Sequence, residues 1–176
     1  MLHARVNPDF VTDYYHLQGQ EMKVTFDKNR DMTGYKTFRL GESEVTTPLE
    51  MRSFNEKVLR EKVYEIIAKE LTEKGLHQSD SNAQLVISFI IGYVERADMY
   101  NAGPFGGTPG SVTSGPSVQD SKIGTLVIDL DDRNDNPIWR ISANVRYVSN
   151  DILGQIESAV EQGFRKFPHK VKTKKK

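Results

Sequence analysis

The sequence has no cysteine among its 176 residues, and this absence excludes disulfide bonds, thiolate metal sites and cysteine nucleophiles. No apolar run approaches the roughly 20 residues that a membrane-spanning helix requires. The N-terminal stretch also lacks the apolar segment of a signal peptide. A Gly-x-Ser-x-Gly nucleophile elbow is missing, and no Gly-Lys-Ser/Thr of a nucleotide-binding loop follows the glycine-rich segment. We therefore predict a non-catalytic protein without a cofactor or a bound metal ion.

The charge of the chain is balanced in total but unevenly distributed. Lysine and arginine total 24, as do aspartate and glutamate, but five of the lysines lie in residues 169–176. The remaining chain holds 19 basic side chains against 24 acidic ones, and this acidic body argues against nucleic-acid binding. We expect the lysine-rich end to be a disordered, solvated tail. Contact of the tail with phosphates or anionic lipid is the alternative.

Hydrophobic patterning predicts five strands and two helices in the order ββαβββα. Strands in runs with helices apart indicate the α+β class, and we expect a largely antiparallel sheet of about five strands with both helices packed on one face. The third strand is apolar on both alternating faces, so we expect it to be central and covered on both sides. Trp139, on the apolar face of the last strand, is expected in the core. The predicted strands are 22–27, 35–40, 83–96, 123–130 and 137–148, and the predicted helices are 48–74 and 150–168.

Capping residues define the expected ends of the first helix. Thr47 and Glu50 form a capping box at its start. Gly75 suits the left-handed conformation that ends many helices, and Leu76 is placed to contact Leu71, as in a Schellman motif. This helix would be about 40 Å long at 1.5 Å per residue.

Composition assigns the remaining segments. Residues 22–168 are predicted to form a single domain, preceded by an N-terminal extension, 1–21, that shows no clear hydrophobic period. Residues 97–122 are dense in glycine, proline and serine, which is typical of a long mobile loop. Tyr100 and Phe105 are aromatic residues in this loop, and we regard them as candidate partner-binding residues.

The acidic stretch 129–135, between the last two predicted strands, resembles a metal site in composition. Its carboxylate and amide oxygens are the ligands that calcium prefers. The common calcium loop needs Gly at its sixth position and Glu at its twelfth, and counting from Asp131 or Asp132 finds neither. We interpret the stretch as a turn, because Asp and Asn stabilise turns through side-chain hydrogen bonds. The alternative hypothesis is a small-ligand or metal-dependent enzyme that uses Asp129, Asp131 or Asp132.

Four stretches have a distinctive order and spacing: VTFDKNRDMTGYKTF, LTEKGLHQSDSNAQLVISF, GTLVIDLDDRNDNPIWR and AVEQGFRKFP. In this order, over residues 22–168, they resemble the domain of unknown function 4136 family. The resemblance implies an exported bacterial protein on the periplasmic side of the cell envelope, anchored by a lipid on an N-terminal cysteine. This chain has neither that cysteine nor a signal segment, so either the native start was removed or this member carries no lipid. The resemblance supplies no catalytic residues.

The resemblance and the missing catalytic motifs together predict a class of function. We expect a non-catalytic cell-envelope domain that binds an unidentified envelope protein or a cell-wall component. Nucleic acid is not expected as a partner. Contact with the membrane is expected only through an N-terminal lipid, which this chain lacks.

Overall fold

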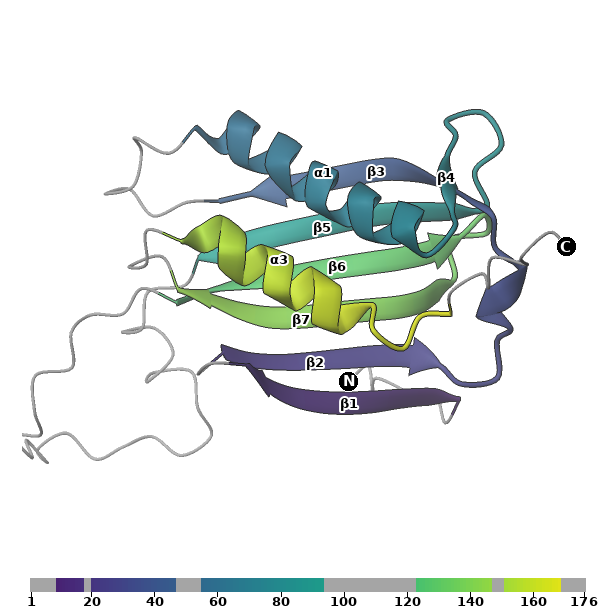
Figure 1. The fold of residues 1–176 in the computed structure, drawn as a ribbon, viewed down its shortest axis with the longest axis horizontal. Helices are drawn as coiled ribbons and strands as arrows, with labels where there is room; N and C mark the ends of the chain where they lie inside the picture. The colour runs from purple at the N-terminus through teal and green to yellow at the C-terminus, as the bar shows by residue number, and fades with distance from the viewer. Residues whose placement is uncertain (1–8, 18–19, 47–54, 94–122, 147–150, 169–176) are drawn as a thin grey trace, which may run out of the picture.

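The computed structural model describes residues 9–17, 20–46, 55–93, 123–146 and 151–168. These residues form a seven-stranded sheet with two helices on one of its faces, which confirms the α+β class and the one-sided helix layer (Figure 1). The predicted mobile loop 97–122, with Tyr100 and Phe105, and the predicted tail 169–176 lie outside the described residues.

The strands are arranged in the order β1-β2-β7-β6-β5-β3-β4 across the sheet. The sheet thus contains the five predicted strands and two more, β1 and β4. In chain order the elements are β1 Phe10–Leu17, β2 Gln20–Asp27, the 3-10 turn η1 Met32–Gly34, β3 Thr37–Val45, α1 Glu56–Glu73, β4 His77–Gln78, β5 Leu85–Tyr93, β6 Ile123–Asp132, β7 Pro137–Arg146 and α3 Ile152–Gly163.

Strand β1 lies in the segment 1–21, which the sequence predicts to be an N-terminal extension. It pairs with β2 along its whole length, from Phe10 opposite Asp27 to Leu17 opposite Gln20. Residues 10–17 are therefore part of the sheet, and the prediction that the domain begins at residue 22 is wrong at this end. The alternation of apolar and polar residues in β1 is weak because β1 lies at the edge of the sheet, where neither face is deeply buried.

The sheet is largely antiparallel, as predicted, with one parallel region. Four of the six strand pairings are antiparallel. Strand β3 is parallel to both β4 and β5. Parallel neighbours need a crossover connection, and α1 provides it between β3 and β5.

Helix α1 begins later than predicted. Asn55 is its N-cap, with an extended backbone, and its side-chain oxygen accepts hydrogen bonds from the N–H groups of Lys57 and Val58 at 3.0 and 3.3 Å. The capping box of Thr47 and Glu50 lies outside the described residues. With 18 residues, α1 is about 27 Å long rather than about 40 Å.

The C-terminal end of α1 is a Schellman motif, as predicted. Gly75 has a φ of 89°, in the left-handed region that favours glycine. The N–H of Gly75 donates to the carbonyl of Thr72 at 2.9 Å, and the N–H of Leu76 donates to the carbonyl of Leu71 at 3.1 Å. Leu71 and Leu76 are both buried, so the two residues that end the helix in this motif are part of the core.

One core lies between the helices and the sheet. Helix α1 contributes Leu59, Val63, Ile67 and Leu71 to it, whereas Val58 on the same helix is 49% exposed. Trp139 is 2% exposed and stacks on Phe26 with ring centroids 4.8 Å apart, which confirms its predicted place in the core.

Helix α3 is shorter than the predicted 150–168. Asp151 is its N-cap and accepts a hydrogen bond from the N–H of Gly154 at 3.0 Å. The helix ends at Gly163, and the chain continues in tight turns that bury Phe164 and Phe167 against the sheet.

Candidate binding surface

The acidic stretch between β6 and β7 is a hairpin turn organised by Asp132. Its Oδ1 accepts hydrogen bonds from the N–H groups of Asn134 and Asn136 at 2.8 and 3.1 Å. Asp135 takes the left-handed conformation, with a φ of 57°, which aspartate tolerates well. The hairpin closes with a hydrogen bond of 2.9 Å from the N–H of Asp132 to the carbonyl of Asn136. These bonds are those of a turn, as the sequence predicts.

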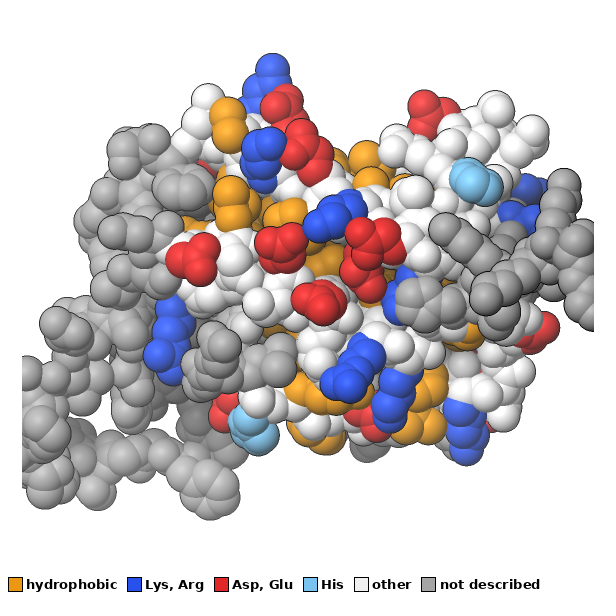
Figure 2. Space-filling model, viewed as in Figure 1, with side chains coloured by type: hydrophobic (Ala, Val, Ile, Leu, Met, Phe, Trp, Pro, Cys, Tyr) orange, Lys and Arg blue, Asp and Glu red, His pale blue; other side chains and the backbone are white. Residues whose placement is uncertain are grey.

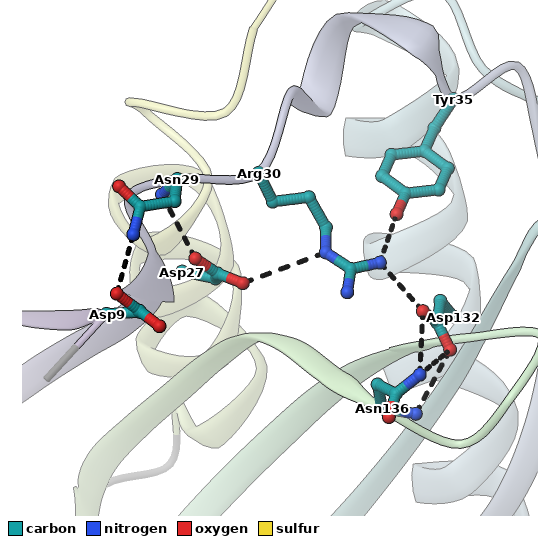
Figure 3. Close-up of polar contacts among 7 residues, drawn as sticks. All are labelled: Asp9, Asp27, Asn29, Arg30, Tyr35, Asp132 and Asn136. Atoms are coloured by element: carbon teal, nitrogen blue, oxygen red, sulfur yellow. Dashed lines mark hydrogen bonds and ion pairs between the residues drawn. The ribbon is translucent and has the colours of Figure 1, made fainter. Parts of the chain in front are cut away.

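Arg30 joins this hairpin to the connection between β2 and β3 (Figure 3). Its Nη1 donates to Oδ2 of Asp132 at 2.7 Å and to the hydroxyl of Tyr35 at 3.1 Å, and its Nε lies 3.7 Å from a carboxylate oxygen of Asp27. Two parts of the chain that are 102 residues apart are thereby held together at one end of the sheet. The cluster therefore has a structural role.

The hydrogen bonds to Asp132 stabilise its ionised form. Desolvation by burial opposes ionisation, but the hydrogen bonds from Asn136, Asn134 and Arg30 outweigh it and lower the pKa of Asp132 to about 2. The same cluster favours the charged form of Arg30, whose pKa is raised by its hydrogen bonds to Tyr35 and Asp132. At neutral pH the pair is ionised.

The other two carboxylates of the proposed metal site also have identified environments. Asp129 forms a bidentate ion pair with Arg140, at 2.5 and 2.8 Å. Burial, followed by the negative charge of Asp129, raises the pKa of Asp131. Within the described ranges, no three His, Asp or Glu side chains lie close enough together to hold a metal ion.

The sheet face opposite the helices displays its side chains without a covering helix in the described part of the chain. Strand register and alternation define this open face: Met22 and Ile141 are buried toward the helices, so their neighbours Lys23 and Ser142 point the other way. One row of side chains crosses five strands on this face, in the order Tyr14, Lys23, Ser142, Val127 and Ile90.

The adjacent row on the open face is polar throughout. It runs from Thr12 and Thr25, whose hydroxyls are 2.9 Å apart, through the Arg140–Asp129 ion pair to Ser88. The open face therefore offers hydrogen-bond donors, acceptors and both signs of charge beside a row with an aromatic and two aliphatic side chains. Non-obligate protein interfaces have a similar mixture of polar and apolar area, as does the rest of a protein surface.

A hollow of about 450 Å³ lies on the open face, near the β1 edge. Its lining combines an aromatic ring, a hydroxyl, an amide and both signs of charge, so it suits a polar ligand. Its lining residues are Tyr14, Tyr15, His16, Glu21, Met22, Lys23, Thr125, Ser142 and Asn144. None of them was identified from the sequence as a site residue.

Two apolar side chains of the open face are largely exposed. Tyr14 is 77% exposed and Ile90 is 50% exposed. Ile90 belongs to the strand that we expected to be covered on both sides. That prediction is wrong for Ile90, because the two helices lie on the opposite face and half of its side chain remains in contact with solvent.

The helix-covered face has a different character. Acidic side chains gather along the line between the two helices (Figure 2). They line a groove of about 190 Å³ that includes Glu70, Glu157 and Glu161. Burial raises the pKa of Glu70, while Lys74, 3.7 Å away, opposes that rise. Lys69 lies 3.5 Å from Glu157, so this ion pair across the groove joins α1 to α3.

The sequence contains no signal that would have located the hollow or the Arg30–Asp132 pair, because both depend on long-range strand register. Among the described helices, none is long and apolar enough to cross a membrane. Tyr100 and Phe105 lie outside the described residues, so their proposed role stays a prediction.

Solved structures of several proteins resemble the chain in fold, among them the following three. A PelC dodecamer from Paraburkholderia phytofirmans matches with a TM-score of 0.51 and 12% identity, covering 86% of this chain and 99% of that one. A PDZ domain protein from Parabacteroides distasonis matches with a TM-score of 0.55 and 18% identity, covering 93% of this chain and 37% of that one. A DUF4136 family protein from Bacteroides thetaiotaomicron matches with a TM-score of 0.50 and 12% identity, covering 90% and 95%.

No curated protein matches the chain. The family model described as Domain of unknown function (DUF4136) matches residues 22–169, which include every described element after β1 except the first two residues of β2. The expected family resemblance is thereby confirmed, and the chain belongs to the DUF4136 family.

Proposed function

We propose that this chain is a non-catalytic binding domain of the bacterial cell envelope and that the open face of its sheet is the binding surface. The observation that carries the proposal is the asymmetry of the sheet: helices cover one face, and the opposite face presents a polar hollow flanked by the exposed Tyr14. The partner is an envelope protein or a cell-wall component. The carboxylates of the acidic turn support this class over a metal enzyme, because Asp132 and Asp129 are engaged with Arg30 and Arg140.

The proposed location is the periplasmic side of the envelope, with a lipid anchor on the native full-length protein. Family membership is the support for this part of the proposal. Fractionation of cells that express the native gene with a C-terminal tag tests it. Recovery of the tagged protein in the envelope fraction is expected, and recovery in the cytoplasmic fraction would contradict it.

Site-specific photo-cross-linking in native envelopes tests the binding surface. A cross-linking residue in place of Thr125, which lines the hollow, is expected to capture a reproducible partner. A matched residue in place of Glu65, exposed on α1, is the control and is expected to capture none. In the Thr125 background, Lys23→Ser should lower the yield of the captured product. Absence of any reproducible product from Thr125, or the same product from Glu65, would refute the proposed surface.

A further inference from the structure

Among the described residues, strand β1 is an edge strand without the usual protection against pairing. It pairs with β2 on one side, and in the described part of the chain no strand pairs with its other side. Its eight residues contain no proline and no lysine, and its register with β2 runs without a bulge. Its single charge, Asp13, is paired with Lys166 at 2.8 Å. Long, regular edges of this kind are templates for another strand. The opposite edge of the sheet, β4, has only two residues.

The helix layer leaves the β1 edge accessible. Helix α1 contacts β3 and β4, and α3 contacts β7 and β2. Figure 1 shows β1 beyond this layer, at the border of the sheet. A strand that approaches the β1 edge therefore meets no described helix.

The backbone groups available at this edge can be assigned from the ladder. The N–H of Lys28 donates to the carbonyl of Asp9 at 3.0 Å, and these two residues continue the β1–β2 register. Asp9 therefore belongs to a hydrogen-bonded pair, and every second residue after it also points its backbone groups toward β2. The N–H and C=O groups of Thr12, Tyr14 and His16 consequently point away from the sheet.

We infer that the β1 edge pairs with β1 of a second copy of this chain, antiparallel and about a twofold axis between the two Tyr14 residues. In this register Tyr14 lies opposite Tyr14 of the second copy, and Thr12 lies opposite His16. All three carry outward-pointing backbone groups, as an antiparallel ladder requires. The two sheets join into one, with both helix layers on the same side.

The charge of Asp13 and the length of β1 favour this register over its two neighbours. A shift that places Thr12 opposite Tyr14 would bring Asp13 directly opposite Asp13 of the second copy, and like charges at that position are destabilising. A shift in the other direction shortens the overlap, because β1 ends at Leu17. The Tyr14-centred register instead places Asp13 opposite Tyr15.

The dimer also extends the hollow of the open face. Tyr14 and His16 line the hollow and lie at the β1 edge. Pairing places Tyr14 and Thr12 of the second copy beside them, so the hollows of both copies meet at the seam. A contact of one strand with one strand is at the small end of protein interfaces, below about 1,200 Å², so we expect a dimer whose population depends on concentration.

Single-cysteine variants test the register directly, because the chain has no cysteine of its own. In the proposed dimer the Cα atoms of the two residues 14 are about 5.5 Å apart, a distance that a disulfide spans. Mild oxidation of purified Tyr14→Cys is expected to give a covalent dimer. Thr12→Cys alone should not cross-link, whereas a mixture of Thr12→Cys and His16→Cys should. Lys62→Cys on α1 is the control and should remain monomeric.

Sedimentation velocity of the purified wild-type chain over a wide concentration range tests dimer formation without cross-linking. Tyr14→Pro removes an outward N–H that pairs with no strand in the described part of the chain, so it should weaken dimerisation at least about tenfold while the circular dichroism spectrum is retained. Val58→Ser, which removes an exposed apolar side chain from α1, should leave the dimer unchanged.

Two outcomes would overturn the inference. They are a wild-type chain that stays monomeric at the highest concentration, and equal cross-linking of Thr12→Cys and Tyr14→Cys. Both experiments use only the purified chain, so their failure is distinguishable from failure of capture through Thr125 in native envelopes.

Discussion

The indole Nε1 of Trp139 donates a hydrogen bond of 3.1 Å to the carbonyl oxygen of Gly163. This bond joins β7 to the last residue of α3 in a site that is closed to solvent. The close approach requires a glycine, because a Cβ atom at position 163 would overlap the side chain of Ile141. This contact between β7 and α3 therefore depends on the indole N–H of Trp139 and on the absence of a side chain at Gly163.

Trp139→Phe should destabilise the protein although it keeps an aromatic ring in the core. The carbonyl of Gly163 would lose its indole partner while buried, and such a loss costs about 1–3 kcal/mol. The smaller ring also leaves part of the volume between Phe26 and Phe167 unfilled. Equilibrium unfolding in urea measures the free energy. A change below about 0.5 kcal/mol would show that this hydrogen bond contributes little.

Gly163→Ala should lower the free energy of unfolding by about 1–3 kcal/mol, because Ile141 has to move in a filled core. The opposite sign is normal where a helical glycine has space for a methyl group. Gly34→Ala is the matched control, since no atom lies near its added Cβ, and it should be neutral within about 0.5 kcal/mol. Ile141→Val should cost less in the Gly163→Ala background than in the wild type. A stabilising effect of Gly163→Ala would contradict the close approach.

Acid should weaken the fold through Asp132. Its pKa is lowered to about 2 in the folded chain, so the carboxylate contributes stability above the unfolded value of about 4, and this contribution is lost as pH falls from about 4 to 2. The expected loss is about 2 kcal/mol, measured as the difference between wild type and Asp132→Asn in urea unfolding at several pH values.

The difference between wild type and Asp132→Asn is measured because other carboxylates also change the stability with pH. Burial raises the pKa of Asp131 and of Glu70, so these two groups increase the free energy of unfolding as the pH falls. Asp80→Asn, on an exposed loop, is the control and should keep the wild-type pH dependence. A difference between wild type and Asp132→Asn that does not change from pH 7 to pH 2 would show that the hairpin does not depend on the ionised carboxylate.

The Asp129–Arg140 ion pair should contribute little to stability in spite of its bidentate geometry. The Arg140 side chain is 56% exposed, and exposed ion pairs contribute under about 1 kcal/mol. A double-mutant cycle with Asp129→Asn and Arg140→Gln, at low salt and at 1 M salt, measures the coupling energy. We expect a small coupling energy that salt reduces. The exposed Lys62–Glu65 pair on α1 serves as a reference of the same class.

Several elements were predictable because their determinants are local. The alternation of Leu85, Ile87, Phe89 and Ile91 identifies a buried strand, and these four side chains are buried. Gly75 ends α1 because the left-handed conformation is accessible to glycine without steric cost. The aspartates and asparagines between β6 and β7 form a turn through hydrogen bonds over two to four residues.

The first residue of a helix was less predictable, because several residues in one segment can act as the N-cap. Thr47 and Glu50 fit a capping box, yet Asn55 accepts the hydrogen bonds from the first turn of α1. The choice depends on where Leu59 and Val63 meet the sheet, since most helical stability comes from packing of the apolar face.

The sequence alone determined that the chain has an α+β fold, with Trp139 in the core and a polar turn before the strand that carries it. Hydrophobic periodicity and turn chemistry act over a few residues, so they can be recognised locally. Only the tertiary structure decided that β1 joins the sheet, that β3 lies parallel to β5, that Arg30 meets Asp132, and that Tyr14 and Lys23 border one hollow. Each of these depends on strand register between distant segments. Register is selected by the burial of a whole face at once, and no local pattern contains that information.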